Sequence, residues 1–305
     1  MPVITRSRAA FTVVVMIRIG LSTSSVFPLK TEEAFRLARR AGYDGVEIMV
    51  TRDETTQDAA GLNALAKKYD MPVLSIHAPV LVLTAFVWGR DPRVKLEKSA
   101  ELARATGAGT VVVHPPFRWQ GGYALQFLAI VRELRAAWGV EIAIENMFPW
   151  NVAGRGLKAY APGWDPVTMD CDAVTLDFSH AALSGRNALA MASTLGTRLR
   201  HVHLCDGSGS LADGRVFDEH LLPGRGTQPV AEVLAHLAAS DWNGSVVAEI
   251  NTRKARSERD RLELLRETIE FARAHTTPQL SRVQEQTQTT SPRVFAQPER
   301  TTTRG

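Results

Sequence analysis

The sequence predicts an α/β fold, a single (β/α)8 TIM barrel, and two observations support this class. Eight short runs of apolar and β-branched residues alternate along the chain with longer helical patterns, or with a long loop after the fifth run, as in parallel strands joined by helices. These repeats occupy about 260 residues, which matches the length of such a barrel. No polar linker divides them, so two stacked doubly wound domains are the less favoured alternative.

Each strand is expected where β-branched and apolar residues cluster between turn residues. The expected strands are 17–22, 45–50, 73–77, 110–114, 140–145, 173–177, 199–204 and 245–250. Helices are expected to begin at capping residues such as Thr31 and to end at glycines such as Gly42. The expected helices are 31–40, 57–69, 92–106, 122–138, 187–195, 229–239 and 257–275. Long loops are expected after the fifth and seventh strands.

The two ends of the chain differ in composition from the middle. Residues 1–15 are expected to be a flexible arm, residues 16–275 the barrel, and residues 276–305, rich in Thr, Gln, Pro, Ser and Arg, a disordered tail. Met16 opens a good strand pattern and is a candidate for the true start. Each end carries a net charge of +2, so the barrel, with 30 basic and 30 acidic residues, is neutral. A nucleic-acid partner is therefore disfavoured.

The sequence indicates a cytoplasmic protein with no membrane segment. No apolar run approaches the roughly 20 residues of a membrane span. Arg18 interrupts the apolar stretch 9–21, and no small-residue cleavage site follows, so a signal peptide is not expected. Cys171 and Cys205 are the only cysteines, which argues against a disulfide framework.

Acidic residues and histidines recur where the expected strands end, which is where the active site of such a barrel lies. Each taken alone is more often a hydrogen-bonded polar residue than a ligand. Together they would repel and desolvate one another unless they were paired or bound a metal. Their oxygens and nitrogens suit zinc or manganese. The set comprises His77, His114, Glu145, Asp177, His180, His203, Asp218, His220 and Glu249.

Four of these residues lie in motifs that resemble the xylose isomerase-like barrel superfamily, which includes sugar isomerases, epimerases and endonuclease IV. They are Glu145 in Ile-Glu-Asn, Asp177 in Leu-Asp-Phe-Ser-His, His203 in His-Val-His-Leu-Cys-Asp and Glu249 in Val-Ala-Glu-Ile. The resemblance implies that these four bind one divalent metal and that Glu145 and Glu249 are catalytic proton-transfer groups. Glu47, in Gly-Val-Glu, resembles the sugar-enzyme branch and is predicted to bind substrate.

The other five residues resemble endonuclease IV (AP endonuclease family 2), whose nine ligands hold three zinc ions. They are His77, His114, His180, Asp218 and His220. This chain departs from that family in Asp177-Phe-Ser-His and in Leu204-Cys-Asp, and the long DNA-penetrating loop after the second strand is not evident. The resemblance therefore implies the metal cluster more strongly than it implies DNA repair.

Two further residues are predicted to contact substrate. Arg225, between Gly224 and Gly226, could pair with a phosphate, although a loop that needs glycine dihedrals explains the same pattern. Trp119 follows the fourth strand, where its ring could stack on a sugar or could form a hydrophobic lid.

The leading prediction is a divalent-metal-dependent isomerase or epimerase of a sugar or sugar phosphate, with Glu145 and Glu249 removing and returning a proton. A zinc phosphodiesterase of the endonuclease IV type is the alternative, and a non-catalytic metal-loaded binding protein is a third class. The expected cofactor is zinc, two or three ions, or manganese. The expected partner is the small-molecule substrate, and a homo-oligomer stays open.

Overall fold

The computed structural model describes residues 16–79, 84, 86–152, 155–157, 159–209, 211–212, 215–216 and 218–277. The predicted arm at 1–15 lies outside the described residues, as does the predicted tail beyond residue 277. Within the described ranges, no helix combines the length and apolar character needed to cross a lipid bilayer.

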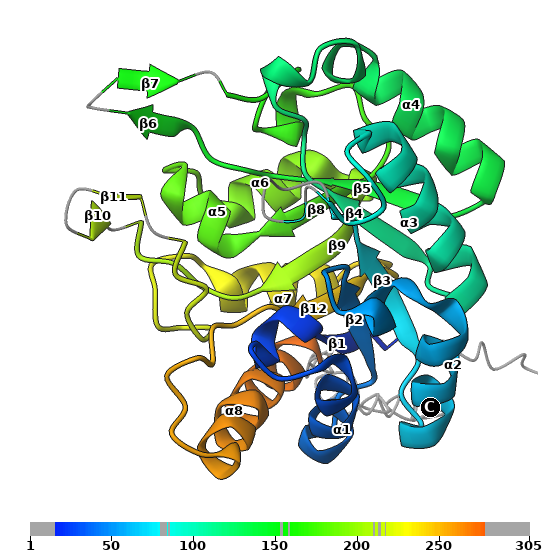
Figure 1. Ribbon diagram of the computed structural model, residues 1–305. Coiled ribbons are helices and arrows are strands. Elements are labelled where there is room, and N and C mark those ends of the chain that lie inside the picture. The colour runs from blue at the N-terminus through cyan, green and yellow to red at the C-terminus, as the bar shows by residue number, and fades with distance from the viewer. Residues whose placement is uncertain are drawn as a thin grey trace, which may run out of the picture.

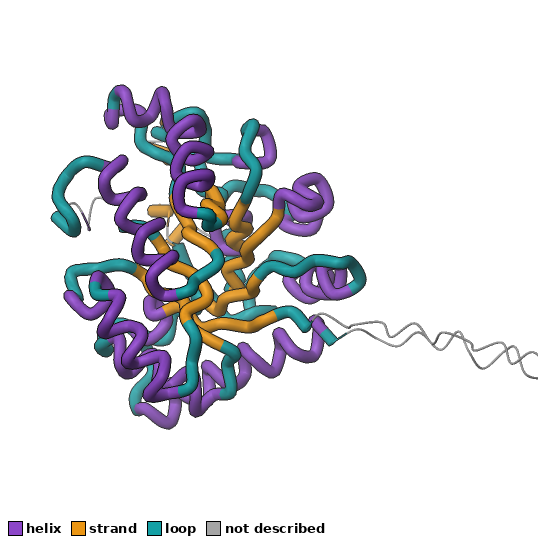
Figure 2. The backbone as a smooth tube through the Cα atoms, turned by 90° about the vertical axis from the view of Figure 1, so that its right-hand side faces the viewer, coloured by secondary structure: helices purple, strands orange, loops and turns teal. Residues whose placement is uncertain are grey.

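Eight parallel strands close into a barrel and confirm the predicted fold class. Their order around the barrel is β1-β12-β9-β8-β5-β4-β3-β2. Figure 2 shows the strands at the centre and the helices around them. The strands are β1 (Arg18–Ser22), β2 (Gly45–Met49), β3 (Val73–His77), β4 (Thr110–Val113), β5 (Glu141–Glu145), β8 (Val174–Asp177), β9 (Leu199–Leu204) and β12 (Ser245–Ala248).

The outer layer consists of helices whose apolar faces pack on the strands (Figure 1). Several have the expected ends: Asp91 caps α3 by accepting two backbone N–H groups, and Gly107 ends it in the left-handed conformation. The helices are α1 (Thr31–Ala41), α2 (Ala59–Tyr69), α3 (Pro92–Thr106), α4 (Gly122–Trp138), α5 (Phe178–Leu183), α6 (Ala188–Leu195), α7 (Val230–Ala238) and α8 (Glu258–Thr276).

The loops that follow β5 and β9 contain structure that was not predicted. Antiparallel pairs form between β6 (Trp150–Val152) and β7 (Arg155–Leu157), and between β10 (Leu211–Ala212) and β11 (Arg215–Val216). The short helix α5 also begins directly after β8, where no helix was predicted. Both hairpins lie on the same side of the molecule in Figure 1.

The interior of the barrel contains a polar layer among the apolar ones. Glu47 on β2, Ser75 on β3 and His201 on β9 are all fully buried, and Glu47 contacts both of the others. Since β2 and β9 are not neighbours in the sheet, the contact between Glu47 and His201 crosses the barrel. This polar layer lies directly beneath the side chains at the carboxyl ends of the strands, since Glu47 also contacts His203.

Candidate metal centre

Predicted site residues from six strands meet at the carboxyl ends of the barrel strands. His77, Glu145 and Asp177 are the last residues of β3, β5 and β8. His203 is the fifth residue of β9, and two more predicted residues, His114 and Glu249, directly follow β4 and β12. All six side chains are buried. The parallel barrel thus gathers residues that are far apart in sequence.

The Nδ1 atom of His203 lies among three carboxylates. It is 3.0 Å from Glu145 Oε1, 2.9 Å from Glu249 Oε2 and 3.7 Å from Asp177 Oδ2. One ligand atom from each of the four residues lies within 4.8 Å of the others. Three carboxylates and one imidazole in so small a volume form a donor set that suits a divalent cation.

Glu145 connects this group to a second set of imidazoles. Its Oε2 lies 3.2 Å from His77 Nε2 and 2.8 Å from His114 Nε2. Its Oε1, which faces His203, is also 3.3 Å from His180 Nδ1. The two oxygens of Glu145 therefore face two different groups of candidate ligands.

Asp218 joins the last two predicted ligands. Its Oδ2 lies 3.1 Å from His180 Nε2 and 2.9 Å from His220 Nε2. The Ser179 hydroxyl donates to the other oxygen, Oδ1, at 2.6 Å. All nine predicted ligands thus belong to one continuous network, and these three form a further group that could hold an ion.

Backbone carbonyls fix two of the imidazoles in the orientation that metal binding requires. His180 Nδ1 lies 2.9 Å from the carbonyl oxygen of Asn146, and His220 Nδ1 lies 2.8 Å from that of Glu249. A carbonyl only accepts hydrogen bonds, so each Nδ1 carries the proton. Each Nε2 is then the atom that faces Asp218 and that can bind a cation in place of a proton shared with this carboxylate, and this is how ligating histidines are held.

Asn146 and Asp177 position one another. The Asn146 side chain accepts a 2.7 Å hydrogen bond from the backbone N–H of Asp177 and donates to its carbonyl at 3.0 Å. Asp177 Oδ1 accepts from the N–H of His180 at 2.7 Å and so caps α5. The role of Asn146 could not be predicted from the sequence, because the partner of its side-chain amide, Asp177, lies 31 residues further along the chain.

The electrostatics show strong coupling between the carboxylates and the imidazoles. Burial opposes ionisation of Glu145 and Glu249, yet the imidazoles, chiefly His203, lower both pKa values: that of Glu145 falls well below its usual range and that of Glu249 falls to about 2. Burial raises the pKa of Asp177. Burial also opposes protonation of His180 and His203, but their carboxylate neighbours raise both pKa values well above the usual range.

These pKa shifts describe a metal-free site in which ionised carboxylates stabilise the protonated form of the neighbouring imidazoles. A divalent cation would take the place of those protons, because ligating imidazoles are neutral. The nine residues therefore fit a divalent metal, and their number and grouping suffice for more than one ion.

The three residues predicted to contact substrate lie outside the group of nine candidate metal ligands. Glu47 lies inside the barrel and is 0% exposed, with its oxygens facing His201 and His203, so it cannot reach a substrate at the rim. Arg225 pairs with Glu267 on α8 instead of an open phosphate site. Trp119 is 60% exposed and stacks on Phe117, with ring centroids 4.5 Å apart.

The loop around Arg225 is already occupied by a carboxylate of the protein. Asp206 accepts hydrogen bonds from the N–H groups of Gly224 and Gly226 at 3.0 and 2.9 Å. A Cβ at Gly226 would lie 2.3 Å from the Asp206 carboxylate, so glycine is needed for close approach. These amides are not available to cradle a phosphate, and the prediction of a phosphate-binding loop is wrong for this reason.

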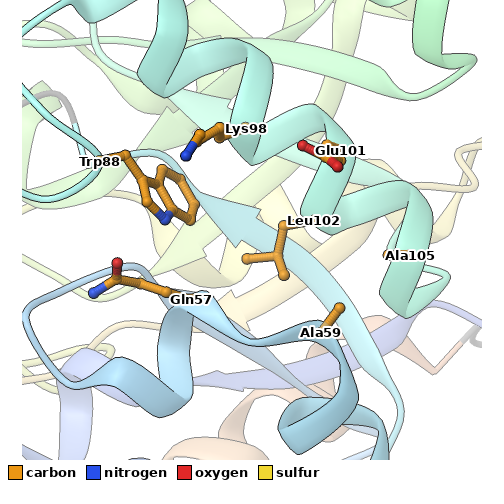
Figure 3. A pocket seen from close by; sticks show the side chains of 7 residues that line it. All are labelled: Gln57, Ala59, Trp88, Lys98, Glu101, Leu102 and Ala105. Atoms are coloured by element: carbon orange, nitrogen blue, oxygen red, sulfur yellow. The ribbon is translucent and has the colours of Figure 1, made fainter.

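Figure 3 shows a groove on the outside of the barrel, between α2 and α3. None of the predicted site residues lines it. Its lining mixes an indole, two charged side chains and small apolar groups, with no convergent set of ligands. We therefore place the functional site at the strand ends. The lining residues are Gln57, Ala59, Trp88, Lys98, Glu101, Leu102 and Ala105.

Comparison with known proteins places the chain in a family. Residues 35–275 match the family model of the xylose isomerase-like TIM barrel. An uncharacterised protein of Mycobacterium tuberculosis (strain H37Rv) is 46% identical over 278 residues, which cover 85% of this chain and 98% of that protein. Fructoselysine 3-epimerase of Escherichia coli O157:H7 is 24% identical over 259 residues, 76% of this chain and 90% of the epimerase.

Among solved structures, that of IolI protein with a bound zinc atom resembles this chain with a TM-score of 0.63 at 18% sequence identity. The similarity covers 85% of this chain and 99% of that one. At this level of identity it supports the fold. Given the matched family model and the closed eight-stranded barrel, the chain belongs to the family of xylose isomerase-like TIM barrels.

Proposed function

We propose that this protein is a divalent-metal-dependent isomerase or epimerase of a sugar or sugar phosphate. The observation that carries the proposal is the position of His203 Nδ1, which has carboxylate oxygens of Glu145 and Glu249 at 3.0 and 2.9 Å. Two carboxylates that both lie close to one imidazole nitrogen can bind a common metal ion, and they can also transfer protons to and from a substrate bound there.

The acid and base would be Glu145 and Glu249. They come from β5 and from the end of β12, and two strands separate these in the barrel, so the two carboxylates approach from different sides. One carboxylate removes a proton from the carbon beside a carbonyl, and the other, as a carboxylic acid, returns one. Removal and return on opposite faces inverts that carbon. A divalent metal bound there would act as a Lewis acid that polarises the carbonyl.

Other residues would hold the substrate and exclude water. His180 and His220 lie next to the metal-binding carboxylates and could hold substrate oxygens or a further ion. Phe148 packs against His180, with ring centroids 5.2 Å apart, and supplies an apolar wall. The substrate class is supported by the epimerase relative, and zinc by the IolI structure.

Solvent exchange tests this proposal. The metal-loaded protein is incubated in D2O with panels of ketoses and ketose phosphates, and deuterium at each carbon is measured by NMR. We expect incorporation beside the carbonyl of at least one substrate, lost in Glu145→Gln and Glu249→Gln and after chelation. A metal-loaded protein that exchanges no carbon-bound proton in any substrate would contradict the proposal.

A phosphodiesterase of the endonuclease IV type is the second candidate, and the bridging position of Glu145 favours it. His77 and His114 at 3.2 and 2.8 Å from Glu145 Oε2, together with the group around Asp218, would support two or three ions. Such a cluster can activate a water and neutralise a phosphodiester. Chelator-sensitive incision of a duplex with an abasic site would replace the first proposal with this one.

We also infer a cytoplasmic location. Cys171 and Cys205 are both buried and free rather than paired, as in a reducing compartment.

A further inference from the structure

The carboxylate of Glu47 lies beneath the candidate metal centre and is completely enclosed. Its Oε2 accepts a 2.7 Å hydrogen bond from Ser75 and lies 3.0 Å from His201 Nε2. Its Oε1 lies 3.2 Å from His203 Nε2. This is an ion-pair contact, and neither Oε1 nor His203 Nε2 has a hydrogen-bond partner among the described residues, so each depends on the other for its polar contact.

His203 therefore has one nitrogen in each of two environments. Nδ1 faces the carboxylates of Glu145, Asp177 and Glu249, and Nε2 faces Glu47. Because Nδ1 needs a free lone pair to bind a cation, the ring's proton must be on Nε2. A carboxylate beside Nε2 stabilises that tautomer, and it also holds the ring plane toward the rim.

The other rim imidazoles make this arrangement distinctive. His180 and His220 direct their protonated nitrogens at neutral backbone carbonyls, those of Asn146 and Glu249. His203 differs from these two in that no backbone carbonyl faces its inner nitrogen, Nε2, whose neighbour is the carboxylate of Glu47. A charged acceptor withdraws the proton more strongly than a carbonyl does, so it makes the opposite nitrogen a better electron donor.

Glu47 cannot contact a substrate at the rim of the barrel. It is 0% exposed, and both of its oxygens face imidazoles or a hydroxyl. Burying a carboxylate without a compensating partner is costly. A packing role alone would be served better by an apolar side chain, so the charge itself calls for an explanation.

We propose that Glu47 is a positioning residue that fixes His203 in the tautomer and orientation that bind the catalytic metal, and that it strengthens that bond. The inference rests on the proposed metal centre. Partners of this kind contribute about 10- to 100-fold to metal affinity. Ser75 and His201 hold the second oxygen and keep the carboxylate aimed at His203.

The test measures metal affinity, using zinc alone and a competing chromophoric chelator. Glu47→Gln keeps the size of the side chain and removes its charge. We expect it to bind zinc about 10- to 100-fold more weakly than wild type, with the same number of ions at saturation. The matched control is Thr175→Val, on β8, which pairs with the strand that carries His203. Thr175 is equally buried, and its hydroxyl has no hydrogen-bond partner within the described part of the chain, so its removal should leave the affinity unchanged.

A second measurement uses wild-type protein alone, so it does not require that the Glu47 variant folds. In wild-type protein loaded with zinc, 15N NMR of the imidazoles should show His203 with a protonated Nε2 and a metal-bound Nδ1. The reverse tautomer, or an unprotonated Nε2, would overturn the proposal.

The outcomes separate this inference from the proposed function. If wild type binds no metal, the metal centre itself fails. If wild type binds zinc and Glu47→Gln binds it with equal affinity, only the positioning role fails. If Glu47→Gln binds one ion fewer, with the remaining affinity unchanged, an ion lies between Glu47, His201 and His203, and the positioning role is again wrong.

Discussion

The hydroxyl of Ser24 donates a 3.0 Å hydrogen bond to Oε1 of Glu249, 225 residues further along the chain. Ser24 lies in a short 3-10 helix, η1 (Thr23–Val26), that follows β1, and Glu249 follows β12. These two strands pair to close the barrel. Closure therefore orients the carboxylate that we propose to be a catalytic group, and its other oxygen, Oε2, faces His203.

The variant Ser24→Ala should weaken metal binding modestly. It removes one hydrogen bond to the carboxylate, and such a bond contributes about 1 kcal/mol, which corresponds to roughly a fivefold change in affinity. Zinc titration against a chelator measures this, with Ser240→Ala, a serine at the end of α7, as the matched control. An unchanged affinity in Ser24→Ala would mean that Glu249 is held without Ser24.

Two substitutions of Asp177 should separate its roles as ligand and as helix cap. Asp177→Asn keeps an oxygen for the N–H of His180 and removes the charge, so it should abolish activity and weaken metal binding while the melting temperature stays within a few degrees. Asp177→Ala also loses the cap, which costs about 1 kcal/mol. Thermal unfolding and metal titration of both variants give the answer. Wild-type turnover in Asp177→Asn would show that Asp177 is not part of the site.

Removal of the Asn146 side chain should destabilise the barrel. Asn146→Ala leaves the backbone N–H and carbonyl of Asp177 without their partners in a buried place, and each such loss costs about 1–3 kcal/mol. Urea unfolding of the metal-free protein measures the change in free energy of unfolding. A change smaller than about 0.5 kcal/mol, the scale of ordinary surface substitutions, would contradict this role.

The metal-free protein should lose stability as the pH rises above neutrality. Burial opposes protonation of His220, but Asp218 raises its folded pKa to about 10, above the usual 6.5. Its stabilising protonation is complete below pH 6.5 and is lost as the pH rises toward 10. Melting temperatures across that range should fall in wild type and fall less in His220→Gln. An equal fall in both would refute the assignment.

The sequence predicts the barrel well because its signals are local. All eight predicted strands overlap β1 to β5, β8, β9 and β12, and glycines such as Gly42 and Gly107 end helices where expected. Helix α5 was missed because it is six residues long, and its cap, Asp177, was interpreted as a ligand alone. The hairpins β6–β7 and β10–β11 were also missed. Their strands pair over only three and two residues, which is too short for the alternation of apolar and polar residues to show in the sequence.

The candidate ligands could be predicted because the strand ends of a parallel barrel meet at one rim. The residues that support them could not. Glu47 and His201 meet across the barrel interior, and Asp206 binds amides about 20 residues further on. Such partners depend on the register of strands and loops, which a single sequence does not specify. Arg225 was misplaced for the same reason, since its partner Glu267 lies on the last helix.

The most direct test of the account is the number of metal ions bound per chain. Protein purified without chelator is analysed by elemental analysis, beside His77→Ala and His114→Ala, and His236→Ala, a histidine on the exposed face of α7, serves as control. We predict two or three divalent ions per chain, mainly zinc, with fewer in the His77 and His114 variants and no change in the control. Protein that binds no divalent metal, or one ion that both variants retain, would contradict it.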